Sequence, residues 1–322
     1  MKIFLNMYFL LSLILSFNVS ADNQFPIKSL RLLVGFSPGG ASDITSRVVA
    51  QKMSEFFNQP VIVDNKPGAS GVTAAMIVSK ATPDGYTLLS GATSILAINP
   101  ALMLNLEFDP IQDFSPVSQT VSMAQLLVTN LNLKATSLRD LISLAKTKPG
   151  VLNYSSSGNG SSSHLAMELF KVMANVDIVH IPFKGSGQSM PNLMANQVQL
   201  AFDPIPTSLP LFQSGKIKVL AISTLSRSNA IPEIETLSEA GVPGYESSMW
   251  YGILLPAKTP KKIINLHNKA VNYALKKSDV SERFNQLGAQ TKGSTSDEFS
   301  RLIHDEVIKW KKVVVSSGIK AI

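Results

Sequence analysis

The chain has 322 residues, of which 45% are hydrophobic and 16% charged, with no cysteine and a formal net charge of +7. This length suffices for about two domains with proper cores, and the composition is that of a globular rather than a disordered protein. Disulfides and thiolate metal sites are excluded, and the positive charge is spread along the chain, which suits an anionic small molecule or a membrane surface better than nucleic acid.

The first residues follow the pattern of an export signal. Lys2 precedes an apolar run over residues 3–17, and Val19-Ser20-Ala21 supplies a small-x-small cleavage site. This order is typical of a secretory signal peptide, so we predict that residues 1–21 are removed after Ala21 and that the mature protein lies in the periplasm. A retained membrane anchor is the alternative, but the run is short and polar residues follow it closely.

Three predicted strands open the mature chain, and each ends in a loop of small residues. The strands are expected over residues 30–36, 61–64 and 86–90. Ser42 is expected to cap the helix after the first strand, and the second loop opens an Ala-rich helix over residues 72–79. In an open parallel sheet such loops share one edge, where ligands usually bind. The loops of interest are residues 37–43, 65–71 and 91–94.

The middle of the chain repeats this alternation with its own polar loops. A strand is expected to begin at Leu126, and Ser137 with Asp140 indicates the start of a helix that ends before Pro149. Further helices are expected to end near Asn175 and Ala195. The remaining strands are predicted over residues 153–156, 177–183, 198–202 and 217–223.

The C-terminal part is predicted to be mostly helical after a strand over residues 250–255. Thr295 and Glu298 form a capping-box pattern before a long amphipathic helix, which needs a sheet to cover. The simplest arrangement returns this helix to the first domain. We therefore expect one lobe from residues 22–125 and 250–322, a second from 126–249, and two crossings near residues 121–128 and 246–252.

Motifs for catalysis and metal binding are poorly represented. Ala41 stands where a P-loop needs lysine, and the glycine pair around Asn159 lacks the third glycine of a dinucleotide fingerprint. Ser70 has the wrong spacing for a nucleophile elbow. The four histidines are scattered, so we expect no metal and no cofactor. What remains is a set of loops rich in hydroxyls and backbone N–H groups, which bind by hydrogen bonding.

Three charged residues at these loops are candidates for the site, and each has an ordinary alternative. Asp43 is either a first-turn helix acid stabilised by the dipole or a residue that binds ligand or orders the loop. Asp203 follows a strand end and precedes Pro204, so it forms either an Asx turn or a ligand contact. Lys184 is either a cleft residue or simply a solvated lysine.

Several motifs, in the same order, resemble those of the periplasmic receptors of tripartite tricarboxylate transporters, often called Bug receptors. The similarity runs from about Pro26 to the C-terminus. Two positions depart from the family pattern, because Phe183 replaces a common tyrosine and Ser37 a frequent proline. The matching segments are Phe36-Ser37-Pro38-Gly39-Gly40-Ala41-Ser42-Asp43, Asn65-Lys66-Pro67-Gly68-Ala69-Ser70-Gly71, Pro83-Asp84-Gly85-Tyr86, Phe183-Lys184-Gly185, Arg227 with Ile231-Pro232, and Glu239-Ala240-Gly241-Val242-Pro243-Gly244-Tyr245.

The resemblance implies an α/β fold with two lobes, of the periplasmic-binding-protein or Venus-flytrap type, each lobe a mostly parallel sheet flanked by helices. It implies a monomeric receptor that is not an enzyme, binds a small carboxylated molecule in the cleft and delivers it to an inner-membrane permease. Carried over by motif, the ligand-binding residues would be Ser37, Pro38, Gly39, Gly40, Ala41, Ser42, Asp43, Gly68, Ala69, Ser70, Gly71, Thr93, Ser94, Ser157, Gly158, Ser161, Ser162, Ser163, His164, Lys184, Gly185 and Asp203.

Two other functions stay open at this point. A secreted serine hydrolase could use a hydroxyl among Ser157 to Ser163 with His164 as general base, although a histidine beginning a helix more often caps or packs. A receptor could also serve a membrane signalling protein instead of a transporter. The sequence does not identify the ligand, since Phe183 and Ser37 both change groups that would face it.

Overall fold

The computed structural model describes residues 25–317, which form a mixed α/β fold with two sheets that share one long strand. In the first sheet, β1 pairs in parallel with β2 and β3, as the alternation of strands and helices predicts. The later strands of this sheet run antiparallel to their neighbours. Its strands are β1 (Leu30–Val34), β2 (Val61–Asn65), β3 (Thr87–Ala92), β9 (Ser248–Pro256), β10 (Ala289–Thr291) and the first part of β4 (Phe114–Thr129).

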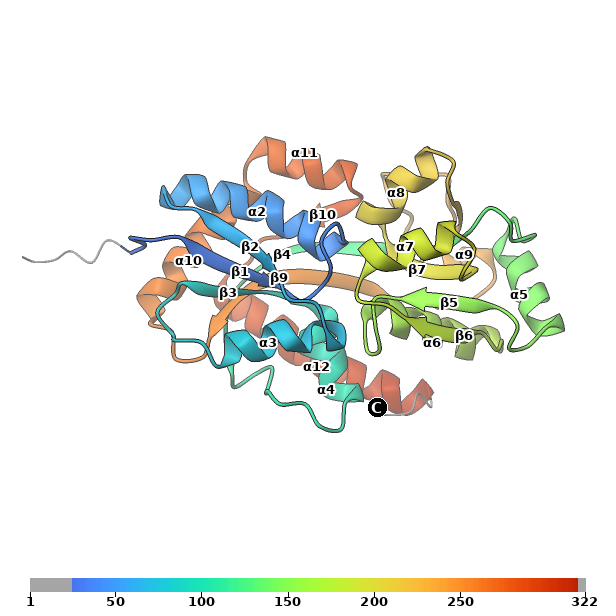
Figure 1. Ribbon diagram of the computed structural model, residues 1–322, viewed down its shortest axis with the longest axis horizontal. Coiled ribbons are helices and arrows are strands. Elements are labelled where there is room, and N and C mark those ends of the chain that lie inside the picture. The colour runs from blue at the N-terminus through green and yellow to red at the C-terminus, as the bar shows by residue number, and fades with distance from the viewer. Residues whose placement is uncertain (1–24, 318–322) are drawn as a thin grey trace, which may run out of the picture.

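The second sheet has the same mixed character. β5 pairs in parallel with β6 and β7, while β7 and β8 each run antiparallel to the end of β4. Both sheets therefore place the C-terminal ends of their parallel strands, and the loops that follow them, near the junction (Figure 1). Besides the end of β4, the second sheet contains β5 (Asn153–Ser156), β6 (Val179–Pro182), β7 (Leu200–Pro204) and β8 (Lys218–Ile222).

Two chain crossings connect the lobes. In β4, residues up to Ala124 pair with β9 or β10, whereas the residues from Gln125 to Thr129 pair with β7. The return crossing lies at Ser247, just before β9 begins. The N–H group of Ser247 donates to the carbonyl oxygen of Ser223. Since both crossings are extended backbone at one place in the molecule, they are suited to act as a hinge.

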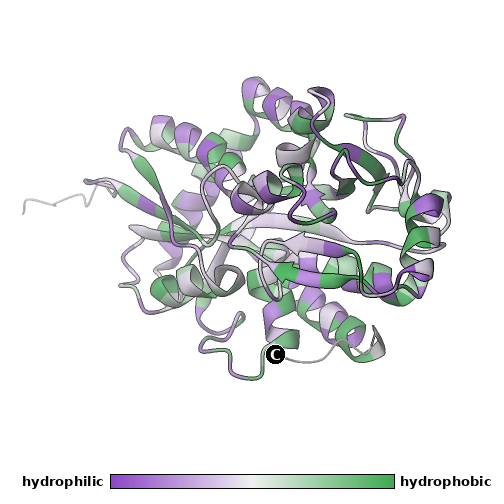
Figure 2. Ribbon diagram, turned by 45° about the vertical axis from the view of Figure 1, so that its right-hand side comes forward, coloured by the Kyte–Doolittle hydropathy of each residue, from purple (hydrophilic) through white to green (hydrophobic). Residues whose placement is uncertain are grey.

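Helices cover both faces of the first sheet. Figure 1 shows α2 and α11 on one face and α3, α4 and α12 on the other. The helices carry polar and apolar stripes (Figure 2), as amphipathic helices over a sheet should. This lobe contains α2 (Ala41–Phe57), η1 (Ala69–Gly71), α3 (Val72–Ser79), η2 (Ser94–Ile98), α4 (Asn99–Leu102), α10 (Lys261–Leu275), α11 (Ser278–Gln286) and α12 (Ser296–Ser317).

The second lobe has its own helices and its own core. Tyr154, Phe170 and Phe202 are buried in one cluster of that lobe, and the other cluster contains Ile205. A separate cluster fills the first lobe, and the buried Phe299 of α12 belongs to it, so the C-terminal helix packs on the first sheet. The second lobe contains α5 (Leu138–Thr147), α6 (Ser162–Ala174), α7 (Ser186–Met194), α8 (Ile205–Gln213) and α9 (Leu237–Ala240).

Local capping signals were accurate at two of three positions. Ser137 and Asp140 form the predicted capping box of α5, and Thr295 and Glu298 exchange the same pair of hydrogen bonds before α12. The prediction that Ser42 caps α2 was wrong, because the N-cap is Gly40 and Ser42 already lies inside the helix. The Ser42 hydroxyl therefore makes no N-cap hydrogen bond.

Two predicted segments differ from the structure. The loop expected over residues 91–94 is absent, because Gly91 and Ala92 end β3 and the chain turns at once into the π-helical turn η2. The strand expected to begin at Leu126 begins at Phe114 and runs for 16 residues. The signal peptide and its cleavage after Ala21 fall outside the described residues. Within residues 25–317, no helix has both the length and the apolar character that a membrane span requires.

Candidate functional site

A small cavity lies at the junction of the two lobes. It has a volume of about 30 Å³, and its walls come from both sheets and from the starts of several helices. Its lining residues are Phe36, Gly40, Ala41, Ser42, Ala92, Ser94, Gln125, Ser157, Ser161, Ser162, Ser163, Ser186, Pro204, Met249 and Tyr251.

Four helices begin at this cavity. The N-cap residues are Gly40 for α2, Ser161 for α6, Gly185 for α7 and Pro204 for α8. The first N–H groups of a helix have no partner inside it, and the helix dipole adds a partial positive charge there. The first helix belongs to one lobe and the other three to the opposite lobe, so an anion in the cavity would face helix starts from both sides.

Several buried polar side chains on the cavity wall have no hydrogen-bond partner within residues 25–317. The hydroxyl oxygens of Ser42 and Ser162 and the Oε1 atom of Gln125 are buried and make no hydrogen bond among the described residues. A buried polar atom left without a partner costs about 1–3 kcal/mol. These three groups are therefore the first candidates for contacts with a ligand.

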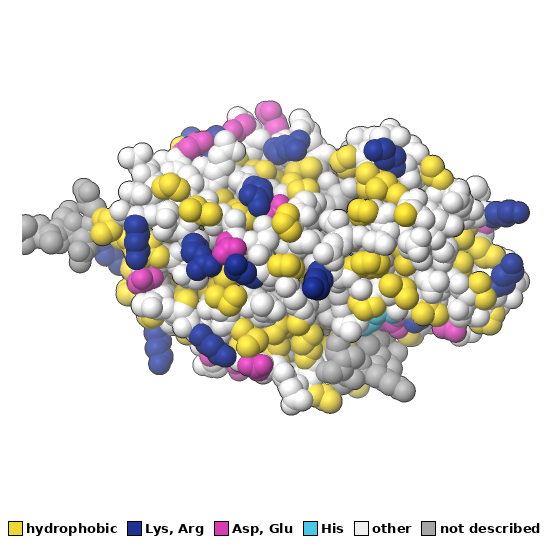
Figure 3. Space-filling model, viewed as in Figure 1, with side chains coloured by type: hydrophobic (Ala, Val, Ile, Leu, Met, Phe, Trp, Pro, Cys, Tyr) yellow, Lys and Arg dark blue, Asp and Glu magenta, His cyan; other side chains and the backbone are white. Residues whose placement is uncertain are grey.

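The cavity wall carries no full charge. Among the described residues that line it there is no lysine, arginine, histidine or carboxylate, and the apolar part comes from residues such as Phe36, Met249 and Tyr251. On the face shown in Figure 3, lysines and arginines lie scattered singly or in small groups. An anion in the cavity would thus be held by hydroxyls and N–H dipoles and not by an ion pair.

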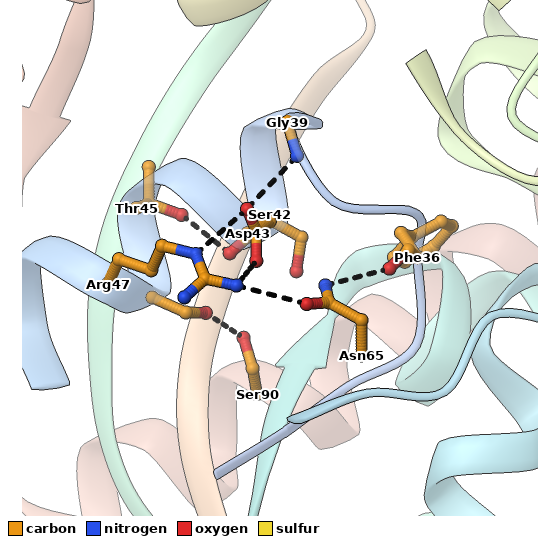
Figure 4. A network of polar contacts seen from close by, with 9 residues as sticks. Phe36, Gly39, Ser42, Asp43, Thr45, Arg47, Asn65 and Ser90 are labelled. Atoms are coloured by element: carbon orange, nitrogen blue, oxygen red, sulfur yellow. Dashed lines mark hydrogen bonds and ion pairs between the residues drawn. The ribbon is translucent and has the colours of Figure 1, made fainter. Parts of the chain in front are cut away.

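Asp43 belongs to a network that holds the glycine turn before α2 (Figure 4). Its carboxylate accepts hydrogen bonds from Gly39 N–H at 3.0 Å and Arg47 Nε at 3.0 Å, and it pairs with the other guanidinium nitrogen at 2.8 Å. Arg47 also donates to Asn65, whose amide donates to the carbonyl oxygen of Phe36. The network ties the first two loops of this lobe together.

The Asp43 carboxylate is held in its charged form. Burial works to raise its pKa, but the hydrogen bonds from Arg47 and Gly39 outweigh burial and keep the pKa below its ordinary value. The Asp43 side chain is 6% exposed and is absent from the cavity lining. Its position is that of a residue that orders the loop.

Asp203 lies at the end of β7, one side chain behind the cavity. It is 1% exposed and accepts a hydrogen bond from the hydroxyl of Thr207, and the hydroxyl of Ser186 lies near enough to affect its pKa. Burial raises its pKa to about 6, against the lowering effect of these two hydroxyls. The same carboxylate adds to the effect of burial in raising the pKa of Tyr251, which lines the cavity.

The two lobes touch directly beside the cavity, and glycines make this contact close. Ser37 N–H donates to the carbonyl oxygen of Lys184 at 3.1 Å, and the Ser70 hydroxyl donates to the carbonyl of Asn159. A Cβ atom added at Gly185 would lie 2.5 Å from Ser37 Oγ, and one at Gly187 would lie 2.4 Å from the carbonyl oxygen of Pro38. The contacts describe a closed form of the cleft.

His164 does not form a pair with a serine hydroxyl in the described structure. Its Nδ1 accepts from Gly160 N–H at 3.1 Å, and its ring stacks on His180 with centroids 4.1 Å apart. Burial lowers the pKa of His164 to about 4 and that of His180 to about 3, so both rings are neutral at pH 7. These contacts make His164 a packing residue of α6, and they give the hydrolase alternative no support.

The predicted site residues fall into three groups. Eight line the cavity between the lobes, namely Gly40, Ala41, Ser42, Ser94, Ser157, Ser161, Ser162 and Ser163. A second, more open pocket at the edge of the cleft is lined by Ser157 again with Gly68, Ala69, Ser70, Gly158 and Lys184. Outside both linings, at the lobe contact or behind the walls, are Ser37, Pro38, Gly39, Asp43, Gly71, Thr93, His164, Gly185 and Asp203.

Sequence reasoning missed seven residues of the cavity wall. Ser186 follows the Lys184-Gly185 pair directly and could have been included with that turn. Gln125 could have been found as a polar residue next to an apolar strand, and Met249 lies beside the predicted strand at Trp250. The others are Phe36, Ala92, Pro204 and Tyr251.

Comparison with known proteins assigns the chain to a family. Residues 45–319 match the family model described as tripartite tricarboxylate transporter family receptor. The chain belongs to this family of receptors. It is 36% identical over 303 residues to protein BugT of Bordetella pertussis, an alignment that covers 94% of the chain and 93% of BugT. The resemblance drawn from the glycine-rich motifs is confirmed, and the family is one of solute receptors rather than enzymes.

Solved structures share the fold over almost the whole chain. The Rhodopseudomonas palustris protein Rpa4515 with adipate is 35% identical, with a TM-score of 0.90 and coverage of 92% of this receptor and 99% of Rpa4515. MatC from the same species with bound malate is 31% identical, with a TM-score of 0.87 and coverage of 90% and 100%. The two-lobed periplasmic-binding-protein fold is thereby confirmed.

Proposed function

We propose that this receptor binds a small dicarboxylate such as adipate or malate in the cavity between its lobes, which has to widen from about 30 Å³ to admit the ligand. The observation that carries the proposal is the set of buried, unpartnered hydroxyls, Ser42 on one lobe and Ser162 on the other, at the starts of two helices. Two related receptors with these acids support the ligand class. The second lobe's polar loops give the cavity a second place for a carboxylate.

The two ends of the ligand would bind to opposite lobes. One carboxylate would accept hydrogen bonds from the first N–H groups of α2 and from Ser42, and the other from Ser162 and Ser186 at the starts of α6 and α7. The carbon chain between them would pack on Met249 and Tyr251. The second, open pocket with Gly68, Ser70 and Lys184 would then flank the ligand instead of enclosing it.

Binding would be coupled to closure about the β4 and β9 crossings, with lobes close to residues 22–125 plus 250–322 and 126–249. A ligand shifts the open–closed equilibrium only by its differential affinity for the two forms, about 5.5 kcal/mol for a change from 1:99 to 99:1. If the ligand binds first at the start of α2, it contacts groups such as Ser162 on the second lobe only after closure. These later contacts supply the difference in affinity.

The closed form would deliver its ligand to an inner-membrane permease of the tripartite type. This follows the family assignment and the periplasmic-binding-protein fold. The apolar run before Ala21 supports export and removal of residues 1–21. We propose a monomer that needs neither metal nor cofactor, since carboxylate recognition by N–H and hydroxyl donors requires none. Among the described residues, no cluster of three histidine or carboxylate groups is suited to a metal ion.

The test is calorimetric titration with adipate and malate, with hexane-1,6-diol as an uncharged control. We expect both acids to bind and the diol not to bind, and a saturating acid at a hundred times its Kd should stabilise the protein by about 2.7 kcal/mol. Ser42→Ala and Ser162→Ala should each weaken binding by roughly tenfold or more, because a hydrogen bond to a charged group is lost.

Ser281→Ala is the matched control, because its hydroxyl only donates to the carbonyl of Ser278 on α11. An unchanged Kd in both cavity variants would show that the ligand binds elsewhere. Binding of the diol with an affinity like that of adipate would contradict the carboxylate class itself.

A further inference from the structure

Asp203 is an unusual neighbour for an anion-binding cavity. It is 1% exposed, and burial raises its pKa while two neighbouring hydroxyls lower it, with no charged side chain among the causes. Tyr251 of β9 interacts electrostatically with Asp203. The hydroxyls near Asp203 come from Ser186 of α7 and Thr207 of α8. On β4, Leu126 is the residue paired with Asp203 in the sheet. A negative charge here would repel an anionic ligand.

The hydrogen bonds around Asp203 have room for an additional proton. Thr207 Oγ1 lies within hydrogen-bond distance of Asp203 Oδ2 and 2.9 Å from the carbonyl oxygen of Pro204. A hydroxyl has only one hydrogen, so it can serve both acceptors only by sharing that hydrogen in a three-centre bond. A protonated Asp203 would donate to Thr207, and Thr207 would then donate to Pro204. In this state each contact has a hydrogen of its own.

Ser186 connects this carboxyl group to the cavity. Its hydroxyl lies near enough to Asp203 to lower the pKa of that carboxyl group, and the residue lines the cavity wall, at 4% exposure. An ionised Asp203 accepts the single hydroxyl hydrogen of Ser186 and so competes with a ligand carboxylate for it. Protonation of Asp203 removes that competition and leaves the Ser186 hydrogen available to the ligand.

We propose that Asp203 is a protonation site of the receptor and takes up one proton from solvent when an anionic ligand binds in the cavity. The inference rests on the proposed function, because the anion is the dicarboxylate assigned above. The step forms one O–H bond at the Asp203 carboxylate and breaks none in the ligand. Asp203 is a positioning residue in this scheme, since it acts on the ligand through Ser186 and does not line the cavity.

The pH dependence follows from this linkage. Ligand-free Asp203 titrates at about pH 6, and an anion nearby moves its titration to higher pH. Above pH 6 each binding event therefore takes up as much as one proton, and the affinity falls by up to about tenfold per pH unit as the pH rises. Below pH 6 the carboxyl group is already protonated and the affinity levels off.

The decisive experiment measures proton uptake by calorimetry. Adipate, and malate as a second probe, are titrated into the mature protein at about pH 7 in buffers of different ionisation enthalpy, and Kd is followed from about pH 6 to pH 8, above the ordinary pKa range of carboxyl groups. We expect uptake of a fraction of a proton up to one, and loss of both the uptake and the pH dependence in Asp203→Asn. Asp305→Asn, whose side chain is 78% exposed, should keep both.

Three results would overturn the proposal. The first is binding of adipate with no proton uptake and an unchanged Kd over this pH range. The second is tighter binding of aspartate or glutamate than of malate, since an ammonium group could then neutralise Asp203 in place of the proton. The third is an Asp203 titration midpoint near the ordinary aspartate value, measured by carbon NMR of the ligand-free protein.

The NMR titration also separates the two proposals. If neither adipate nor malate binds, the proposed ligand class is wrong, yet the NMR midpoint still decides whether Asp203 can be protonated near neutral pH. If Asp203→Asn does not fold, the proton uptake and the NMR titration of the wild-type protein decide the question without it.

Discussion

The two carboxylates behind the cavity, Asp43 on the first lobe and Asp203 on the second, are both buried but live in opposite environments. Asp43 pairs with Arg47 at 2.8 Å and has a lowered pKa. Asp203 has only hydroxyl partners and a pKa raised to about 6. The first lobe thus has a fixed charge that orders its glycine turn, whereas the second has a group that can change its charge near neutral pH. Asp43 and Asp203 occupy similar positions at loops, but their different hydrogen-bond and ion-pair partners determine whether the carboxyl group stays charged.

The largest expected effect is on the stability of the protein. Its dependence on pH should differ between variants of Asp203 and variants of Asp43. The pKa of Asp203 is raised from 3.8 to about 6, so the folded protein binds this proton more tightly than the unfolded chain. The resulting stability is fully present below about pH 4 and is lost as the pH rises through about 6, which amounts to roughly 3 kcal/mol.

Asp203→Asn should therefore have a higher free energy of unfolding than the wild-type protein at pH 8. The gain over the wild type should be smaller at pH 4. The measurement is urea unfolding at both pH values without ligand. Asp43→Asn should show no such gain at pH 8, because there it loses an ion pair that is formed. A parallel pH dependence in the wild type and Asp203→Asn would mean that Asp203 titrates normally.

How far these two roles could be predicted depends on the range of the interactions. Ser137 and Thr295 were placed correctly because capping boxes lie within four residues of sequence. The contact of Asp43 with Arg47 lies one helical turn away and was also within reach of the sequence. For Asp203 the sequence favoured a ligand contact slightly over an Asx turn and left both open, since its burial depends on the packing of α7, α8 and β9.

The cavity was predictable in outline and not in detail. Small-residue loops after parallel strands indicated the edge at which the cavity lies, and Ser161 to Ser163 are on its wall. Gln125 was missed because β4 was expected to begin at Leu126, and buried polar residues such as Ser118 and Thr120 conceal the apolar pattern of its first half. A strand shared by two lobes is specified by partners far away in the chain.

The next effect concerns the contact that brings the two lobes together. Gly187 lies in the first turn of α7, next to Ser186, and a Cβ atom there would lie 2.4 Å from the Pro38 carbonyl oxygen of the loop that Asp43 orders. Gly187→Ala should oppose closure by about 1–3 kcal/mol and weaken adipate binding by roughly 5- to 150-fold. Small-angle scattering with adipate should show a more open molecule.

The stability of the ligand-free protein tests whether this is a closure effect. Alanine is favoured over glycine within a helix, so Gly187→Ala should leave the melting temperature unchanged or slightly raised. Asn192→Ala on the same helix, a half-buried residue whose amide donates to the carbonyl oxygen of Gln188, is the matched control and should bind adipate normally. Wild-type affinity in Gly187→Ala would show that the lobes need not meet at this contact.

The smallest expected effect comes from the fixed carboxylate. Asp43→Asn keeps the size of the side chain and its acceptor for Gly39 N–H but removes the charge that pairs with Arg47. The glycine turn should become less ordered, and adipate binding should weaken by about tenfold, since a hydrogen bond to a charged group contributes about 1.5–3 kcal/mol and part of it is retained. Because Asp43 is charged throughout the range from pH 6 to pH 8, the loss should be the same at every pH. A loss that grew or shrank across that range would mean that Asp43, and not only Asp203, is linked to the ligand by a proton.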